Sequence, residues 1–172
     1  MLIIDSKPAG LEIVGTDQDS IHVSCTAGSD EAAQAAAFYF SPMANGGKLS
    51  VRGIHFNHRD SGLQVKIEVP RRTNLSVRMF AGQVTVEEVK GDKDIDLGAG
   101  QITISAIHPS DYRSVDASVS IGEVQAGPYG SDKGGFFRRF RKTNANGDYR
   151  LQAHVTTGQI DLVGHADQDK PD

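Results

Sequence analysis

A repeated glycine pattern constrains the fold of this chain more than any other feature. The pattern Gly-x-apolar-x-apolar occurs at residues 82–86 and again at residues 100–104. Alternating apolar residues have the two-residue period of half-buried strands, and a fixed spacing between copies is typical of a stacked array. Glycines at positions 82, 100, 122 and 158 are separated by 18, 22 and 36 residues. The repeat predicts an all-β fold, a small parallel β-helix or β-solenoid in which glycines form the corners.

The chain is expected to form one domain over residues 1–172, which is long enough to bury a core without disulfides or metal. Residues 1–70 are interpreted as N-terminal strands with one short helix, in which Asp30 caps an alanine-rich run and 38–40 close onto the core. Residues 71–165 hold the repeats, with an insertion at 127–148 that begins as a glycine-rich loop, and 166–172 form a tail.

The alternation predicts which side chains face the core and which face outward. The predicted core residues are Val84, Val86, Ile95, Leu97, Ile102, Ile104, Val119, Ile121, Ile160 and Leu162. The predicted outward residues are Gln83, Thr85, Asp96, Gln101, Thr103, Ser118, Ser120, Gln159 and Asp161. Cys25, in an alternating run, is expected to be buried as a small hydrophobic residue. Sheet walls ~10 Å apart leave room for side chains only, so we expect any function on the outer face or in the loops.

Several of these segments resemble a known family. They are Val-Lys-Ile-Glu-Val-Pro at 65–70, Leu-Ser-Val at 75–77, the glycine repeats, and Thr-Thr-Gly-Gln-Ile-Asp-Leu at 156–162. Together they are similar to the bacterial putative-adhesin domain of unknown function, over roughly residues 10–165. That family forms β-helical structures and is similar to the head domains of auto-transporter adhesins. The resemblance implies a non-enzymatic interaction or scaffold domain, and it brings no catalytic residues.

Two places are candidates for binding. Thr85 and Thr103 lie on the predicted outer face. The segment 136–142, Phe-Phe-Arg-Arg-Phe-Arg-Lys, combines three phenylalanines with four cations, Arg138, Arg139, Arg141 and Lys142. Such a segment suits an anionic surface or an acidic partner. The alternative is a flap at helical spacing, whose aromatic side chains cap the stack while the charges face water.

The chain contains none of the catalytic motifs that are specific enough to identify an enzyme from its sequence. The chain has no Gly-x-Ser-x-Gly elbow, no His-Glu-x-x-His and no Walker loop, so we expect no enzyme and no cofactor. The alternative is a polysaccharide-active enzyme that uses acidic residues on the outer face. Its candidate residues are Asp94, Asp96, Asp116 and Asp161, and a cleft that gathers three or more carboxylates would favour it.

A possible metal site at residues 54–60 is weak. His55 and His58 point to opposite faces of a strand, and His58 with Asp60 supplies only two ligands, so we expect no bound metal.

Charge and hydropathy limit which partners and which compartment are expected for this chain. A formal net charge of -4 gives no reason to expect a nucleic-acid partner. The apolar run at 2–4 is too short for a membrane span or a signal-peptide core, so the chain as given is expected to be soluble. The compartment is the cell envelope or the exterior if a leader was removed, and otherwise the cytoplasm. We expect an unknown protein or a surface glycan as partner. Homo-oligomerisation through one end of the stack is possible, unless the first strands and 136–142 cap those ends.

Overall fold

The computed structural model describes residues 1–6, 9–28, 36–52 and 63–164, and strands account for most of them. The strands are β1 (Leu2–Ser6), β2 (Ala9–Thr16), β3 (His22–Thr26), β4 (Ala37–Met43), β5 (Gly46–Arg52), β6 (Gln64–Pro70), β7 (Leu75–Glu87), β8 (Lys93–Ile107), β9 (Tyr112–Ala126), β10 (Ser131–Thr143) and β11 (Tyr149–Gly164). Two single-turn 3-10 helices complete the described elements, η1 (Pro109–Asp111) and η2 (Gly127–Tyr129). The expectation of an all-β fold is therefore confirmed.

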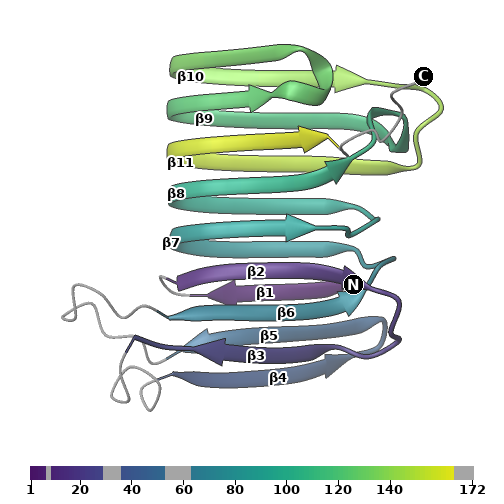
Figure 1. Cartoon of the computed structure of the whole chain (residues 1–172), viewed down its shortest axis with the longest axis vertical. Coiled ribbons are helices and arrows are strands. Elements are labelled where there is room, and N and C mark those ends of the chain that lie inside the picture. Colours follow the sequence, from purple (N-terminus) through teal and green to yellow (C-terminus); the bar gives the residue numbers. More distant parts are fainter. Residues whose placement is uncertain (7–8, 29–35, 53–62, 165–172) are drawn as a thin grey trace, which may run out of the picture.

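The strands form one mixed sheet of eleven strands, stacked like rungs (Figure 1). The main order is β10-β9-β11-β8-β7-β1-β5-β4, while β2 pairs with β6 and β7, and β3 pairs with β6. The inner neighbours run parallel, whereas β10, β4 and β3 are antiparallel to β9, β5 and β6. Antiparallel strands thus lie at both ends of the stack.

Each of the long strands β7, β8, β9 and β11 bends at a glycine and returns along a second arm (Figure 1). Apart from Ile107 at its end, β8 buries odd-numbered residues before the corner, Lys93, Ile95 and Leu97, and even-numbered residues after it, Ile102 and Ile104. Between them lies Gly100 with a φ of +131°, a conformation that other residues rarely adopt. The switch of parity lets both arms turn their apolar side chains toward the same core.

The predicted core is confirmed at every position except Ile121. Ile121 is 49% exposed because it immediately precedes the corner at Gly122, where the chain turns away from the interior. Val124 and Ala126 supply the buried side chains of the following arm instead. The core is one continuous cluster that extends through all the arms of the stack.

Two local predictions in the N-terminal part are wrong. The predicted helix falls partly on residues 29–35, which lie outside the described residues, but Phe38 and Phe40 belong to strand β4. Aromatic side chains favour strands, and here Phe38 lies opposite Val51 of β5. Cys25 is exposed, because it lies in β3, which is flanked by a single strand, β6, in the described part of the chain.

The order of the rungs does not follow the order of the chain. The last strand, β11, lies between β8 and β9, and the first strand, β1, lies between β5 and β7. The start of the insertion, residues 127–135, was expected to be a loop, but it forms η2 and the first part of β10. β10 ends the sheet on one side, as expected of a cap, and β3 and β4 end it on the other. Of the first strands that were expected to cap the stack, β3 lies at an end, whereas β2 pairs on both sides.

No helix in the described ranges has the length and apolar character that would be needed to cross a membrane.

Candidate functional site

Two regions of the outer surface gather polar side chains. We name the first the charged face, formed by the outward residues on the first arms of β8, β11 and β9 and on the part of β10 that pairs with the first arm of β9. Its members are Asp94, Asp96, Gln152, His154, Asp116, Ser118, Arg139 and Arg141. A shallow depression of about 220 Å³ lies on this face and includes three of the acidic residues considered above, Asp94, Asp96 and Asp116. Asp161, the fourth, lies on a second arm opposite Thr103.

Arginines neutralise two of the three carboxylates on the charged face. Asp116 accepts hydrogen bonds from Arg139 Nε at 2.6 Å and from Arg141 Nη2 at 3.2 Å. The hydrogen bond from Arg139 holds the pKa of the Asp116 carboxyl below its usual range. Asp94 pairs with Arg78 at 2.5 Å. Asp116 is therefore kept ionised, and Asp94 is held in an ion pair.

A serine and a histidine meet on the same face. Ser118 Oγ and His154 Nδ1 lie 3.0 Å apart, in a hydrogen bond whose direction depends on the histidine tautomer. A nucleophilic serine needs such a base, and the base needs a third group to orient it. Asp96 lies opposite His154 in the strand register, but no ion pair between them is found among the described residues. The arrangement is thus an incomplete version of a catalytic triad.

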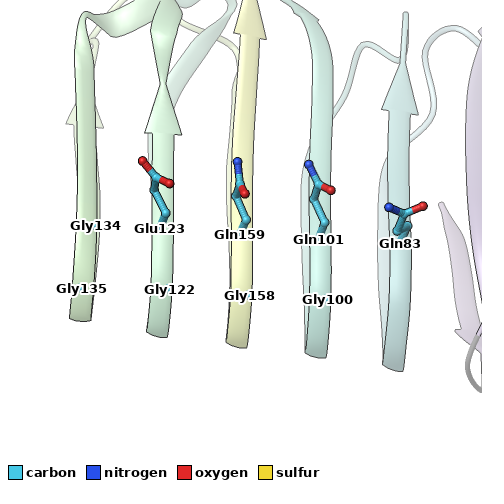
Figure 2. Close-up of a pocket in the computed structure, with 9 residues that line it drawn as sticks. All are labelled: Gln83, Gly100, Gln101, Gly122, Glu123, Gly134, Gly135, Gly158 and Gln159. Atoms are coloured by element: carbon cyan, nitrogen blue, oxygen red, sulfur yellow. The ribbon is translucent and has the colours of Figure 1, made fainter.

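The second region lies along the glycine corners, where a row of side chains forms what we call the amide ladder (Figure 2). The ladder consists of Gln83, Gln101, Gln159 and Glu123, on β7, β8, β11 and β9. Each follows a corner glycine directly and lies in register with its neighbours. An open groove of about 680 Å³ runs along the ladder and continues to Gly134 and Gly135 of β10.

Asp161 orients two members of the ladder. Its carboxylate accepts a hydrogen bond from Gln101 Nε2 at 2.6 Å and another from Gln159 Nε2 at 2.7 Å. Only the N–H groups of an amide can donate to a carboxylate, so both side chains have a defined orientation. Their Oε1 atoms remain as acceptors. Within the described residues, Gln83 and Glu123 make no side-chain hydrogen bond, so their polar atoms are also available for a ligand.

The predicted binding threonines lie beside the ladder. Thr85 and Thr103 are opposite each other on β7 and β8, both half-buried, and Thr103 also lies opposite Asp161. The structure therefore places them on the outer face, as predicted, two residues beyond the glutamines along each strand.

The basic and aromatic segment is a strand and not a helical flap. Phe140 is 6% exposed and packs against Tyr129, with ring centroids 5.2 Å apart. Phe136 and Phe137 are exposed, so the expected packing of all three aromatic rings is wrong. Phe137 points to the face opposite to that of Phe140, because alternate side chains of a strand point to opposite faces. Phe136 directly follows the bend at Gly135 and lies opposite Ile121, which is exposed for the same reason.

The four cations of this segment are not a free cationic patch. Arg139 and Arg141 contact Asp116, and Arg138 Nε donates to the carbonyl oxygen of Gly134 at 2.6 Å. Lys142 is exposed at the edge of the sheet. Cations on an edge strand oppose pairing with another sheet edge, which is a structural reason for their presence.

The possible metal site at His55, His58 and Asp60 lies outside the described residues. Among the residues that are described, no group of three or more potential ligands is close enough to hold a metal ion.

The amide ladder is the feature that sequence reasoning did not single out. Gln83, Gln101 and Gln159 were predicted to point outward, but Glu123 was not considered. The available signal was that a glutamine follows the corner glycine in three of the four repeats, with a glutamate in the fourth.

Comparisons with known proteins support the fold class. No family model matches the chain, and no curated protein sequence matches it. The fold is similar to a crystal structure described as a putative cell adhesion protein from Clostridium sporogenes, with a TM-score of 0.59 and 12% sequence identity. The match covers 95% of this chain and 92% of that chain. At this identity the likeness shows a shared all-β fold over nearly the whole length.

Proposed function

We propose that this chain is a non-enzymatic interaction domain of the adhesin type, built as a β-solenoid, that binds its partner through the outer surface. The amide ladder carries the proposal, because it presents a regular row of outward-facing hydrogen-bonding side chains beside an open groove, with Gln83 exposed and the other three half-buried. The structural neighbour is described as a putative cell adhesion protein, which is consistent with binding to another molecule.

The term solenoid describes the stacking and not a continuous spiral. Its support is that the corner glycines of β7, β8, β11 and β9 align in parallel register above one shared core. The rungs nevertheless do not follow the order of the chain, because the last strand, β11, lies between β8 and β9. A rigid stack of this kind holds outward side chains at fixed spacing, which suits recognition of an extended partner.

The alternative is a polysaccharide-active enzyme, and one observation favours it: Asp94, Asp96, Asp116 and His154 border the same depression. Hydrolysis of a glycosidic bond needs one carboxylic acid that keeps its proton and one ionised carboxylate. Asp116 has a lowered pKa because of Arg139, which is the opposite of what a general acid requires. Asp94 is held in an ion pair with Arg78 and so is not free to contact a substrate. These contacts favour binding over catalysis.

Binding to polysaccharides and hydrolysis of polysaccharides can be measured side by side, which distinguishes the interaction domain from the enzyme. The purified chain is run through gels that contain individual polysaccharides, and released reducing ends are measured in parallel. We expect retarded migration in at least one gel and no release of reducing ends. Release that is abolished by Asp96→Asn would establish the enzyme and contradict the proposal. Migration that no polysaccharide affects would direct the search to a protein partner.

We also propose that β10 acts as a cap of the stack and not as an anion-binding site. The burial of Phe140 against Tyr129 and the contacts of Arg139 and Arg141 with Asp116 support this role. Sedimentation analysis tests the related possibility of association through this edge. We expect the wild type to be a monomer. Replacement of the four cations of 136–142 by threonine should produce a dimer, because the charges that oppose pairing of sheet edges are then absent.

A further inference from the structure

We propose that the groove along the amide ladder binds a linear, uncharged glycan that lies across β7, β8, β11, β9 and β10. This inference rests on the proposed function as an interaction domain and specifies its ligand. Among the described residues, the groove is lined by glycines, three glutamines and one glutamate, and these form no metal-ligating cluster or aromatic cage that would suit another ligand class.

The direction of the groove is the first argument. It crosses five adjacent strands at right angles to them, so a bound chain follows the stacking axis (Figure 2). Four spacings between strands of ~4.8 Å each give the groove a length of about 19 Å. A site of this length and shallow depth fits an extended polymer better than a compact small molecule.

The second argument is the repetition. Three identical side chains, Gln83, Gln101 and Gln159, project at equal intervals from successive strands. Equal spacing of one recognition group fits a ligand with one repeating unit. An extended peptide advances ~3.3 Å per residue and falls out of step with rungs ~4.8 Å apart. The rise per sugar ring in an extended β-1,4-linked polysaccharide is closer to the rung spacing than the rise per residue of a peptide is, so one ring can face each rung over a short stretch.

The third argument is the hydrogen-bonding character. Asp161 accepts hydrogen bonds from the side-chain N–H groups of Gln101 and Gln159. The amide oxygens of these two residues are therefore oriented as acceptors before a ligand binds. Glu123 adds a carboxylate at the next rung, and Gln83 an amide at the other end. An acceptor-rich row matches the many hydroxyl donors of a glycan. The negative charges of Glu123 and Asp161 disfavour polyanions by like-charge repulsion.

The β10 end of the groove offers an apolar surface as well. Phe136 directly follows Gly135 and lies opposite Ile121, and these side chains are 68% and 49% exposed. An aromatic face beside hydrogen-bonding groups suits the apolar face of a sugar ring. Neither side chain lines the groove itself, so this apolar surface adjoins the groove only through Gly135.

The presence of glycine at the corner positions along the groove is explained by the packing of the strands and is not evidence for a ligand. A Cβ on Gly122 would lie 1.7 Å from the carbonyl oxygen of Gly158, so close stacking of the corners already requires glycine. The glutamines have no comparable packing role, because they point outward. The inference therefore rests on the ladder side chains and their orientation by Asp161, not on the glycines.

Titration calorimetry with the full chain tests the inference. The probes are neutral hexasaccharides of β-1,4-linked glucose and of β-1,4-linked N-acetylglucosamine, an oligogalacturonate of the same length, and a lysine-rich decapeptide. The variant is Gln101→Ala with Gln159→Ala. The matched control is Gln152→Ala, which removes an exposed glutamine from the same strand β11 but on the charged face. A circular dichroism melt checks that all three proteins are folded.

We expect one of the neutral hexasaccharides to bind, the double variant to bind it at least about tenfold more weakly, and the control to bind it like the wild type. Three results would overturn the inference: unchanged affinity in the folded double variant, tighter binding of the oligogalacturonate or the decapeptide, or no binding of either neutral probe. Unchanged affinity would leave the proposed interaction function intact and move its site elsewhere. Cleavage of the hexasaccharide would instead contradict the proposed function itself.

Discussion

A Cβ atom on Gly158 would lie 1.7 Å from the carbonyl oxygen of Gly100, the corner glycine of the neighbouring rung. The two glycines are partners in the parallel register of β11 and β8. Gly158 also has a φ of +145°, which side chains rarely permit. Both steric space and backbone conformation therefore require glycine at this corner.

Gly158→Ala is expected to lower the free energy of unfolding by about 3 kcal/mol or more, because a strained backbone and a steric overlap act together. Urea denaturation followed by circular dichroism measures the change. Gly130→Ala is the control, since Gly130 has a φ of +63° but nothing within 4 Å of an added Cβ. That variant should lose only about 1 kcal/mol. Equal losses in the two variants would show that the corners are not closely stacked.

Ile102→Asp is expected to abolish cooperative folding. Ile102 is 0% exposed, in the second arm of β8, and an aspartate there would bury an unpaired charge. Ile102→Val should cost only about 0.5–1.5 kcal/mol, as a small cavity does. A folded aspartate variant with the melting temperature of the wild type would refute the stacked core.

Lys93 is expected to make stability increase with pH above 8. Its side chain is 2% exposed, and Nζ donates to Val89 O at 2.7 Å and to Tyr112 Oη at 2.5 Å. Burial lowers the pKa of Lys93 to about 8, an effect that the charges of Asp92 and Asp111 partly offset. The unfolded chain, with a lysine pKa near 10.5, then binds more protons than the folded chain between these values. The free energy of unfolding should therefore rise with pH in this window.

Denaturant unfolding at pH 8.0 and 9.5 tests this, and the expected rise from Lys93 is about 1–2 kcal/mol. Lys93→Met should remove the rise, because methionine does not titrate. Burial raises the pKa of Tyr112, so its phenol stays neutral in the folded state throughout this range. A variant with the same dependence on pH as the wild type would assign the effect to another group.

Asp116→Asn is expected to strengthen retention on heparin. The substitution removes the carboxylate that now neutralises Arg139 and Arg141, so two guanidinium groups become available to an anionic matrix. The cost to stability should be small, because both arginines are more than half exposed and water screens their interaction with the carboxylate. The measurement is the salt concentration at elution. Replacement of the four cations of 136–142 in the same background should remove the gain, and unchanged elution of Asp116→Asn would contradict the pairing.

The local elements of this fold were predictable because their causes are local. Alternation at residues 84–86 and 102–104 determines which side chains are buried, and glycine at position 100 permits the bend between arms. The order of the rungs was not predictable. Gly158 matches both Gly100 and Gly122 in register, so the repeat pattern alone does not say which rungs are neighbours.

The candidate site depends on that unpredicted order. Asp161 and Gln101 are 60 residues apart in the chain, and they meet only because β11 lies directly beside β8. Each residue was predicted to point outward, but their hydrogen bond could not be predicted. The charge pairing of Asp116 with Arg139 was missed for a related reason, since segment 136–142 was expected at helical spacing and is an antiparallel strand.

The most direct test of the account is an NMR titration of the side-chain amide signals with the neutral hexasaccharide that binds. We predict that the signals of Gln83, Gln101 and Gln159 shift together, that the signal of Gln152 on the charged face does not move, and that the hexasaccharide remains intact. A shift confined to Gln152, or a hexasaccharide that shortens during the experiment, would contradict the account.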